Sequence, residues 1–184
     1  MRRASAIFGS AIFLVLAPGL LAGYVPWLIS RWQVNPPIFG ASWLRVLGIV
    51  LMAAGLPVLL DSFARFAIEG FGTPAPVFPT QHLIVTGLYR YVRNPMYVAV
   101  LSLIVGQGFL FGSVAVLEYA VVVWAGFCLF VLFYEEPTLR STYGQEFEQF
   151  RANVPAWIPR LRPWRPTTSL ESPRSRTDNP NPSQ

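Results

Sequence analysis

The chain has 184 residues, of which 53% are hydrophobic and 12% are charged, and its mean hydropathy is +0.45. This composition is typical of an integral membrane protein and excludes most water-soluble folds of this length. All 14 basic residues are arginine, and they flank apolar segments instead of forming a patch for nucleic acid. With one cysteine, Cys128, and one histidine, His82, neither a disulfide nor a metal site is predicted.

Apolar segments predict the membrane spans. Four of them lie at about residues 7–29, 43–63, 96–111 and 114–134. A helix of about 20 residues crosses a hydrocarbon core of roughly 30 Å. We therefore predict an all-α polytopic membrane helix bundle of four spans, or five if the third region is subdivided.

The first and third segments have special features. Pro18-Gly19 is expected to kink the first segment. A signal peptide is the alternative for it, although its length and the spans that follow favour a membrane helix. The third segment is short, and Gly112-Ser113 is the only break before the fourth, so these two are predicted to form a tight hairpin.

Arginine placement predicts the orientation. With the N-terminus inside, twelve arginines fall on the cytoplasmic side and only Arg31 and Arg45 fall outside. The loop at about residues 64–95 and everything after residue 134 then share the cytoplasmic side. We expect an inner membrane of bacterial type, with Trp157 and Trp164 as anchors at its inner surface.

The C-terminal third divides into a helix and a tail. Leu139, Tyr143, Phe147 and Phe150 recur at helical spacing and predict one helix with a single apolar face. Residues 166–184 cannot bury an apolar face, and we expect disorder there. Three parts are predicted: a first span with its outer loop (1–42), a membrane domain with a cytoplasmic loop and a C-terminal helix (43–165), and a tail (166–184).

A polar cluster covers residues 87–97, immediately before the third span. Asn94 is placed to cap the helix and Pro95 to be its first residue, so the helix start would direct N–H groups at an anion. Arg93 adds a forked pair of donors, and the rings of Tyr89, Tyr91 and Tyr97 attract a cation. An interfacial belt of tyrosine and arginine explains the same residues equally well.

A second polar cluster, Glu135-Glu136, lies at the end of the fourth span. Carboxylates are costly there unless they are solvated or paired. They could bind a cofactor's ammonium or ribose, pair with Arg93 or Arg140, or mark the water boundary and cap the next helix. The loop at residues 70–76, rich in glycine and proline, is predicted to be rigid, either as a binding loop or as a connector.

Three motifs together resemble a known family. These are Gly-Thr-Pro-Ala-Pro (72–76), Leu-Ile-Val-Thr-Gly-Leu-Tyr-Arg-Tyr-Val-Arg-Asn-Pro-Met-Tyr (83–97) and Tyr-Glu-Glu-Pro-Thr-Leu-Arg-Ser-Thr-Tyr-Gly-Gln-Glu-Phe (134–147). In order and spacing they resemble the isoprenylcysteine carboxyl methyltransferase and phospholipid methyltransferase family. The resemblance covers roughly residues 45–165, including an ending at 150–160.

The resemblance implies a membrane methyltransferase that uses S-adenosyl-L-methionine at the cytoplasmic surface. It implies a lipid-like or apolar acceptor: a prenylcysteine carboxylate, a phospholipid amine or a thiol. Arg93 and Glu136 are the implied catalytic residues. The implied cofactor-binding residues are Leu83, Val85, Gly87, Tyr89, Arg93, Asn94, Pro95, Tyr97, Glu135 and Glu136.

One position departs from the family's pattern. Many relatives carry histidine where this chain has Asn94. An amide can cap a helix and form hydrogen bonds, but it cannot act as a base near neutral pH. A mechanism that needs a base at this position is therefore in question.

Two other functions remain open at this stage. One is an NADPH-dependent membrane oxidoreductase of the sterol reductase type, whose C-terminal membrane region is distantly similar. The other is a non-catalytic membrane protein whose basic inner face binds anionic lipid or a partner. Binding of S-adenosylmethionine, of NADPH or of neither cofactor would discriminate among the three.

Overall fold

The computed structural model describes residue 12 and residues 16–68 and 83–165, and the regular secondary structure of these residues is helical, with no strand among them. The main helices are α2 (Val25–Ser30), α3 (Trp43–Ile68), α4 (Pro95–Phe111), α5 (Val114–Phe130), α6 (Glu136–Tyr143) and α7 (Gln145–Asn153). Short 3₁₀ turns lie at Ile38–Gly40 and Gly87–Arg90, and π-helical turns at Leu20–Tyr24 and Val131–Glu135. The prediction of an all-α bundle is confirmed for the described residues.

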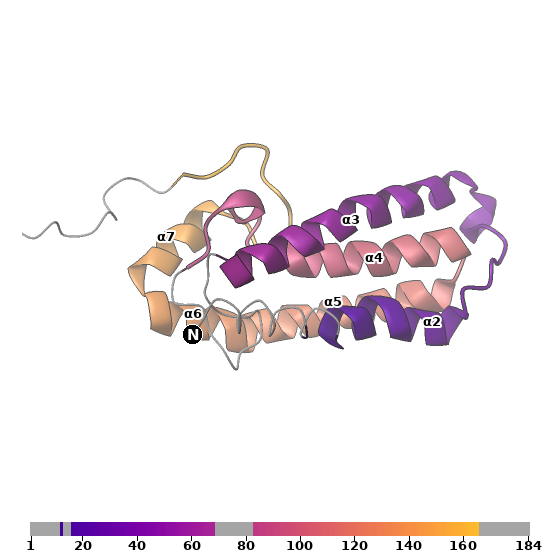
Figure 1. Ribbon diagram of the computed structural model, residues 1–184, viewed down its shortest axis with the longest axis horizontal. Helices are drawn as coiled ribbons and strands as arrows, with labels where there is room; N and C mark the ends of the chain where they lie inside the picture. The colour runs from indigo at the N-terminus through magenta and orange to yellow at the C-terminus, as the bar shows by residue number, and fades with distance from the viewer. Residues whose placement is uncertain (1–11, 13–15, 69–82, 166–184) are drawn as a thin grey trace, which may run out of the picture.

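The long helices lie side by side along one axis (Figure 1). At one end α3 ends, α4 begins, and α6 and α7 turn back over the bundle. We call this the polar end, and the opposite end, where α4 meets α5, the turn end. Figure 1 shows α2 beside α5 toward the turn end, where it completes the bundle.

The predicted apolar segments all appear as helices where they are described. Two runs are long and apolar enough to cross a membrane: Trp43–Arg65 and Val114–Tyr143. Leu16–Ser30 and Pro95–Phe111 are shorter apolar helices, so four crossings remain a prediction. The predicted rigid loop at 70–76, His82 and the tail after residue 165 lie outside the described residues.

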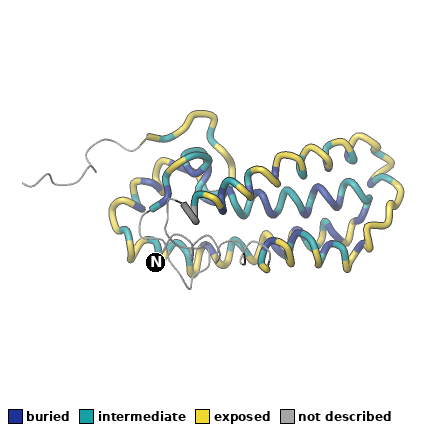
Figure 2. The backbone as a smooth tube through the Cα atoms, viewed as in Figure 1, coloured by how far each residue is buried: buried dark blue, intermediate teal, exposed yellow. Residues whose placement is uncertain are grey.

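The outer surface of the bundle is apolar. Val122 and Phe133 are 68% and 72% exposed on the long helix that begins with α5, and Ile49 is 54% exposed on α3. Figure 2 shows such exposed positions along the outer faces of the helices. A soluble helix would place polar residues there, so these faces indicate contact with lipid.

Glycines bring α3 and α4 into close contact. A Cβ atom on Gly48 of α3 would lie 2.6 Å from the carbonyl oxygen of Gly106 on α4. Two turns further along α3 and two turns back along α4, a Cβ atom on Gly55 would lie 3.1 Å from the carbonyl oxygen of Ala99. Small residues at such positions allow two membrane helices to approach at backbone distance.

The predicted hairpin between the third and fourth spans is confirmed. α4 ends at Phe111, and Ser113 caps α5 by accepting a hydrogen bond from the backbone N–H of Val116 at 3.4 Å. Only Gly112 and Ser113 separate the two helices, so α4 and α5 run antiparallel.

The prediction of one helix after Pro137 is wrong in two respects. The helix of α5 does not end near Tyr134 but continues through the π-helical turn into α6. The expected single helix is also broken at Gly144, whose φ of 51° lies where side chains other than glycine are strained. The apolar residues of α6 and α7 still face one cluster, which contains Phe147 and Phe150.

Candidate active site

Arg65, near the end of α3, contacts the turn at Thr86 and Gly87, where the first polar cluster begins. Gly87 has a φ of 51°, and a Cβ atom there would collide with the guanidinium of Arg65. Arg65 in turn donates to the Thr86 hydroxyl at 3.1 Å and forms an ion pair with Asp61 at 2.8 Å. Glycine is therefore favoured at position 87 by its backbone conformation, whereas the contact with the flexible end of the Arg65 side chain is less costly to relieve.

Three of the predicted cofactor-binding residues pack against α7. Leu83, Val85 and Tyr89 belong to the cluster around Phe147 and Phe150, and Tyr89 is only 6% exposed. Burial raises the pKa of Tyr89 well above its usual value, so its hydroxyl remains protonated. These contacts give the three residues a structural role, while their contact with a cofactor remains a prediction.

Two buried donors lie at the start of α4. Asn94 occupies the N-cap position and Pro95 the first helical position, as predicted, but the Asn94 side chain makes no capping hydrogen bond. Its Nδ2 is buried and has no partner among the described residues, and the same holds for Nε of Arg93. Buried donors without a partner are costly, so these two point to an acceptor that lies beyond the described residues.

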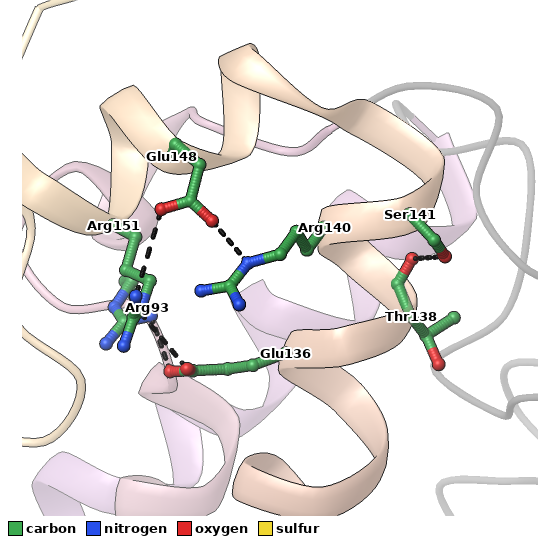
Figure 3. A network of polar contacts seen from close by, with 7 residues as sticks. All are labelled: Arg93, Glu136, Thr138, Arg140, Ser141, Glu148 and Arg151. Carbon is green, nitrogen blue, oxygen red and sulfur yellow. Dashed lines mark hydrogen bonds and ion pairs between the residues drawn. The ribbon is translucent and has the colours of Figure 1, made fainter.

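Glu136 is held by two arginines. Its Oε1 accepts from Arg93 NH1 at 2.7 Å, and its Oε2 lies 3.1 Å from Nε of Arg151 (Figure 3). The side chains of Arg93 and Glu136 are 13% and 15% exposed, so this pair is shielded from water. Arg140, the alternative partner considered for the glutamates, is directed at Glu148 instead.

Glu135 has a different partner. Its Oε2 accepts a hydrogen bond from the Tyr97 hydroxyl at 2.7 Å. The Tyr97 ring stacks on Phe127 at a centroid distance of 4.6 Å and lies 6.4 Å from Trp157. The first polar cluster and the glutamates thus meet, as predicted, through the pairs Arg93–Glu136 and Tyr97–Glu135.

Residues 154–165, which we call the C-terminal strap, fasten the first polar cluster by backbone hydrogen bonds. The N–H groups of Arg93 and Asn94 donate to Pro155 and Ala156 at 2.9 and 3.2 Å. In the other direction, the strap donates from Arg160 to the carbonyl of Tyr91 and from Trp164 to that of Arg90, both at 2.9 Å. The sequence analysis did not anticipate this fastening.

An apolar cavity of about 400 Å³ lies beside Tyr97. Its walls come from three helices, at Ala17, at Met96, Tyr97 and Val100 of α4, and at Gly126 and Phe127 of α5. Tyr97 therefore belongs both to the cavity, through its ring, and to the polar cluster, through its hydroxyl. The sequence analysis missed this cavity and Arg151; the only sequence signal for the cavity was the small residue Gly126 within an apolar helix.

The arrangement favours binding and alignment over acid-base chemistry. Both oxygens of Glu136 are taken by guanidinium groups, and the side chain of Asn94 is an amide. No group of three His, Cys, Asp or Glu side chains that could hold a metal occurs within the part of the chain that the structure describes. The site offers two buried donors that have no partner in the described part of the chain, two neighbouring glutamates and an adjoining apolar cavity.

Two known proteins are similar in sequence to this chain. The Protein-S-isoprenylcysteine O-methyltransferase of Schizosaccharomyces pombe is 40% identical over 80 residues, which cover 42% of this chain and 34% of the relative. The Protein-S-isoprenylcysteine O-methyltransferase B of Arabidopsis thaliana is 32% identical over 120 residues, 64% of this chain and 60% of the relative. The chain thus spans between about a third and three fifths of these relatives.

A family model described as phospholipid methyltransferase matches residues 43–146, more than half of the chain. That match contains the first polar cluster, Glu135 and Glu136, whereas Arg151 and the C-terminal strap lie beyond it. The predicted resemblance is confirmed, and the chain belongs to the phospholipid methyltransferase family.

Proposed function

We propose that this protein transfers a methyl group from S-adenosylmethionine to an acceptor with an apolar tail, at the cytoplasmic surface of the membrane. The observation that carries this proposal is the position of Tyr97. Its ring lines the apolar cavity, and its hydroxyl bonds Glu135 in the polar cluster. One side chain thus joins a space suited to an apolar chain to a site suited to a charged cofactor.

The polar cluster fits the amino-acid part of the cofactor. Nε of Arg93 and Nδ2 of Asn94 are buried donors without a partner in the described chain, at the N-terminus of α4. They would hold a carboxylate, which a helix N-terminus also favours. Glu136 would keep Arg93 in place, as a positioning residue, and Glu135 would take the ammonium or a ribose hydroxyl.

The chemistry supplied by the cofactor is an activated methyl group on a sulfonium. The protein's own residues would position the reactants: Arg93 and Asn94 at one end, and the rings around Tyr97 at the cation. The Tyr97 ring, which stacks on Phe127, would also help to exclude water from this point. Alignment is the main task, because displacement at a methyl carbon needs an attacking group in line with the leaving sulfur.

Among the possible acceptors, we infer a carboxylate. A carboxylate is already ionised near neutral pH, so it can attack without losing a proton, whereas an amine must first be deprotonated. Neither Asn94 nor the doubly paired Glu136 is suited to remove that proton, and Glu135, which accepts from Tyr97, would be engaged by the cofactor. Two relatives are named for isoprenylcysteine O-methylation, which is transfer to such a group on a prenylated cysteine.

The test is methyl transfer from isotope-labelled S-adenosylmethionine to three acceptors: an isoprenylated cysteine, a phosphatidylethanolamine and an apolar thiol. We expect label in the isoprenylated cysteine. Arg93→Ala should abolish most of the transfer, while Arg140→Ala should retain it, because the side chain of Arg140 is 54% exposed and its ion-pair partner is Glu148. Absence of both labelled product and cofactor binding would contradict the proposed function, and label in another acceptor would contradict the carboxylate preference.

A further inference from the structure

The C-terminal strap exposes apolar and basic side chains together. Leu161 is 99% exposed and Ile158 is 78% exposed, although the backbone around them is fixed. The strap also carries Arg160, Arg162 and Arg165 and contains no aspartate or glutamate. Exposed apolar side chains that alternate with arginines are suited to the interface of a membrane that contains anionic lipid.

The exposed face is held in shape by contacts on its inner side. The guanidinium of Arg160 donates to the Asn153 carbonyl at 2.6 Å, and Trp164 packs on Phe150 at a centroid distance of 5.8 Å. Arg90 Nε donates to the Trp164 carbonyl at 2.7 Å. Leu161 is therefore presented by an anchored loop and is not merely at the end of a loose chain.

The position of the strap along the bundle axis also suits contact with a membrane surface. In Figure 1 the orange-to-yellow loop after α7 projects sideways near the end of α3, whereas the turn between α6 and α7 forms the far tip of the polar end. Figure 2 shows this loop as exposed, and the outer face of α3 beyond it is exposed as well. Since that face of α3 is apolar, the loop projects where the lipid-facing surface ends.

We propose that the C-terminal strap docks on anionic phospholipid headgroups, with Ile158 and Leu161 inserted toward the acyl chains and Arg162 and Arg165 at the phosphates. Arginine stems extend along an apolar boundary while their guanidinium groups reach the headgroups. Docking would restrain the same segment that holds Arg93 and Asn94 by backbone hydrogen bonds. Stimulation of methyl transfer by anionic lipid would follow, a consequence that rests on the proposed function, whereas the docking does not.

The experiment uses the full chain with Cys128→Ser and Leu161→Cys, labelled with an environment-sensitive dye. The protein is placed in nanodiscs of phosphatidylcholine alone or with added phosphatidylglycerol, each containing a lipid that carries a quencher near the headgroup. We expect a blue-shifted emission and stronger quenching in the anionic discs. Gln145→Cys is the matched control, because Gln145 is exposed at the turn between α6 and α7, and its dye should be unaffected.

Charge is tested separately. Arg162 and Arg165 are exposed, so Arg162→Gln with Arg165→Gln should leave the fold intact. At about 1 kcal/mol for each arginine, the double variant should shift the docking equilibrium roughly 30-fold toward the free loop. Added salt should weaken docking of the unsubstituted protein in the same direction.

Three results would overturn the proposal. The first is an unquenched dye at position 161 in anionic discs, and the second is equal quenching in discs of either composition. The third is dye-to-dye energy transfer, seen only when a disc holds two copies, which would assign the surface to a second copy of the chain. Quenching by anionic lipid in a protein that transfers no methyl group would support docking while contradicting the proposed function, so the two failures are distinguishable.

Discussion

The two faces of α4 differ in how they meet their neighbours. Toward α3, Gly48 and Gly106 bring the backbones so close that a Cβ atom on either would meet carbonyl oxygen within 3 Å. Toward α5, the helices are close at the turn end, where Gly108 contacts Leu117, but the apolar cavity opens nearer the polar end. A Cβ atom on Gly126 of α5 would meet nothing within 4 Å.

This difference separates stability from function within one helix. The α3–α4 contact has no room to spare, which is how two apolar helices are held together when lipid competes equally well for their surfaces. The α4–α5 contact leaves open space beside Tyr97, at some cost in packing. We interpret the α3–α4 contact as the scaffold and the α4–α5 contact as the place where an acceptor enters. Substitutions at the first should lower stability, and substitutions at the second should raise the KM for the acceptor.

The largest effect is expected at the tight contact. Gly106→Leu would drive a side chain into Met52 and the carbonyl of Gly48, at 2.6 and 2.8 Å even for its Cβ atom. We expect a loss of about 3 kcal/mol or more in stability. Thermal unfolding in detergent, followed by tryptophan fluorescence, measures it; an unchanged midpoint would show that α3 and α4 are not held by this contact.

The next largest effect is expected at Arg93 in the polar cluster. Arg93→Ala removes a charged donor and leaves Glu136 with only Arg151. Charge-assisted hydrogen bonds contribute about 1.5–3 kcal/mol, so the Kd for S-adenosylmethionine should rise on the order of 30-fold. Calorimetric titration in detergent tests this, with Arg140→Ala as the variant expected to bind like the unsubstituted protein.

A smaller effect is expected in the cavity, where a substitution should change acceptor binding and not stability. Gly126→Leu would place a side chain in open space, so stability should be unchanged or slightly higher, while the KM for the acceptor should rise roughly tenfold because the space is filled. Gly23→Leu is the control, since Gly23 also faces open space but does not line the cavity. Equal effects of the two substitutions on KM would contradict an acceptor in the cavity.

The smallest effect is expected at the residue that joins the two regions. Tyr97→Phe keeps the ring in the cavity and removes only its hydrogen bond to Glu135. A single such bond contributes about 1 kcal/mol, so we expect roughly a fivefold loss in kcat/KM. Tyr97→Ala should lose considerably more, and similar losses in the two variants would mean that the ring contributes nothing.

Much of the bundle could be predicted because its signals are local. Apolar length located the helices, Pro95 marked where α4 begins, and Gly112 with Ser113 marked where it turns into α5. The division of the C-terminal helix at Gly144 was missed because the apolar spacing continues unbroken across it. Periodicity indicates which side chains pack into the same core. The apolar side chains of α6 and of α7 pack into one cluster, so the spacing alone does not reveal the break between the helices.

The candidate site was only partly predictable because its contacts join segments distant in sequence. Charge and topology were enough to bring Arg93 near Glu136, 43 positions away. Nothing local showed that Arg151 completes that pair or that the strap fastens Asn94 through a backbone carbonyl. A cavity likewise depends on the spacing between helices, and Gly126 alone cannot reveal it.

The central claim is that the polar cluster and the apolar cavity are two halves of one methyl-transfer site. The most direct measurement is transfer from labelled S-adenosylmethionine to an isoprenylated cysteine, with the Kd of the cofactor and the KM of the acceptor determined for Arg93→Ala and Gly126→Leu. We predict that Arg93→Ala weakens the cofactor alone and Gly126→Leu the acceptor alone. Active protein in which neither substitution changes its constant would contradict the claim.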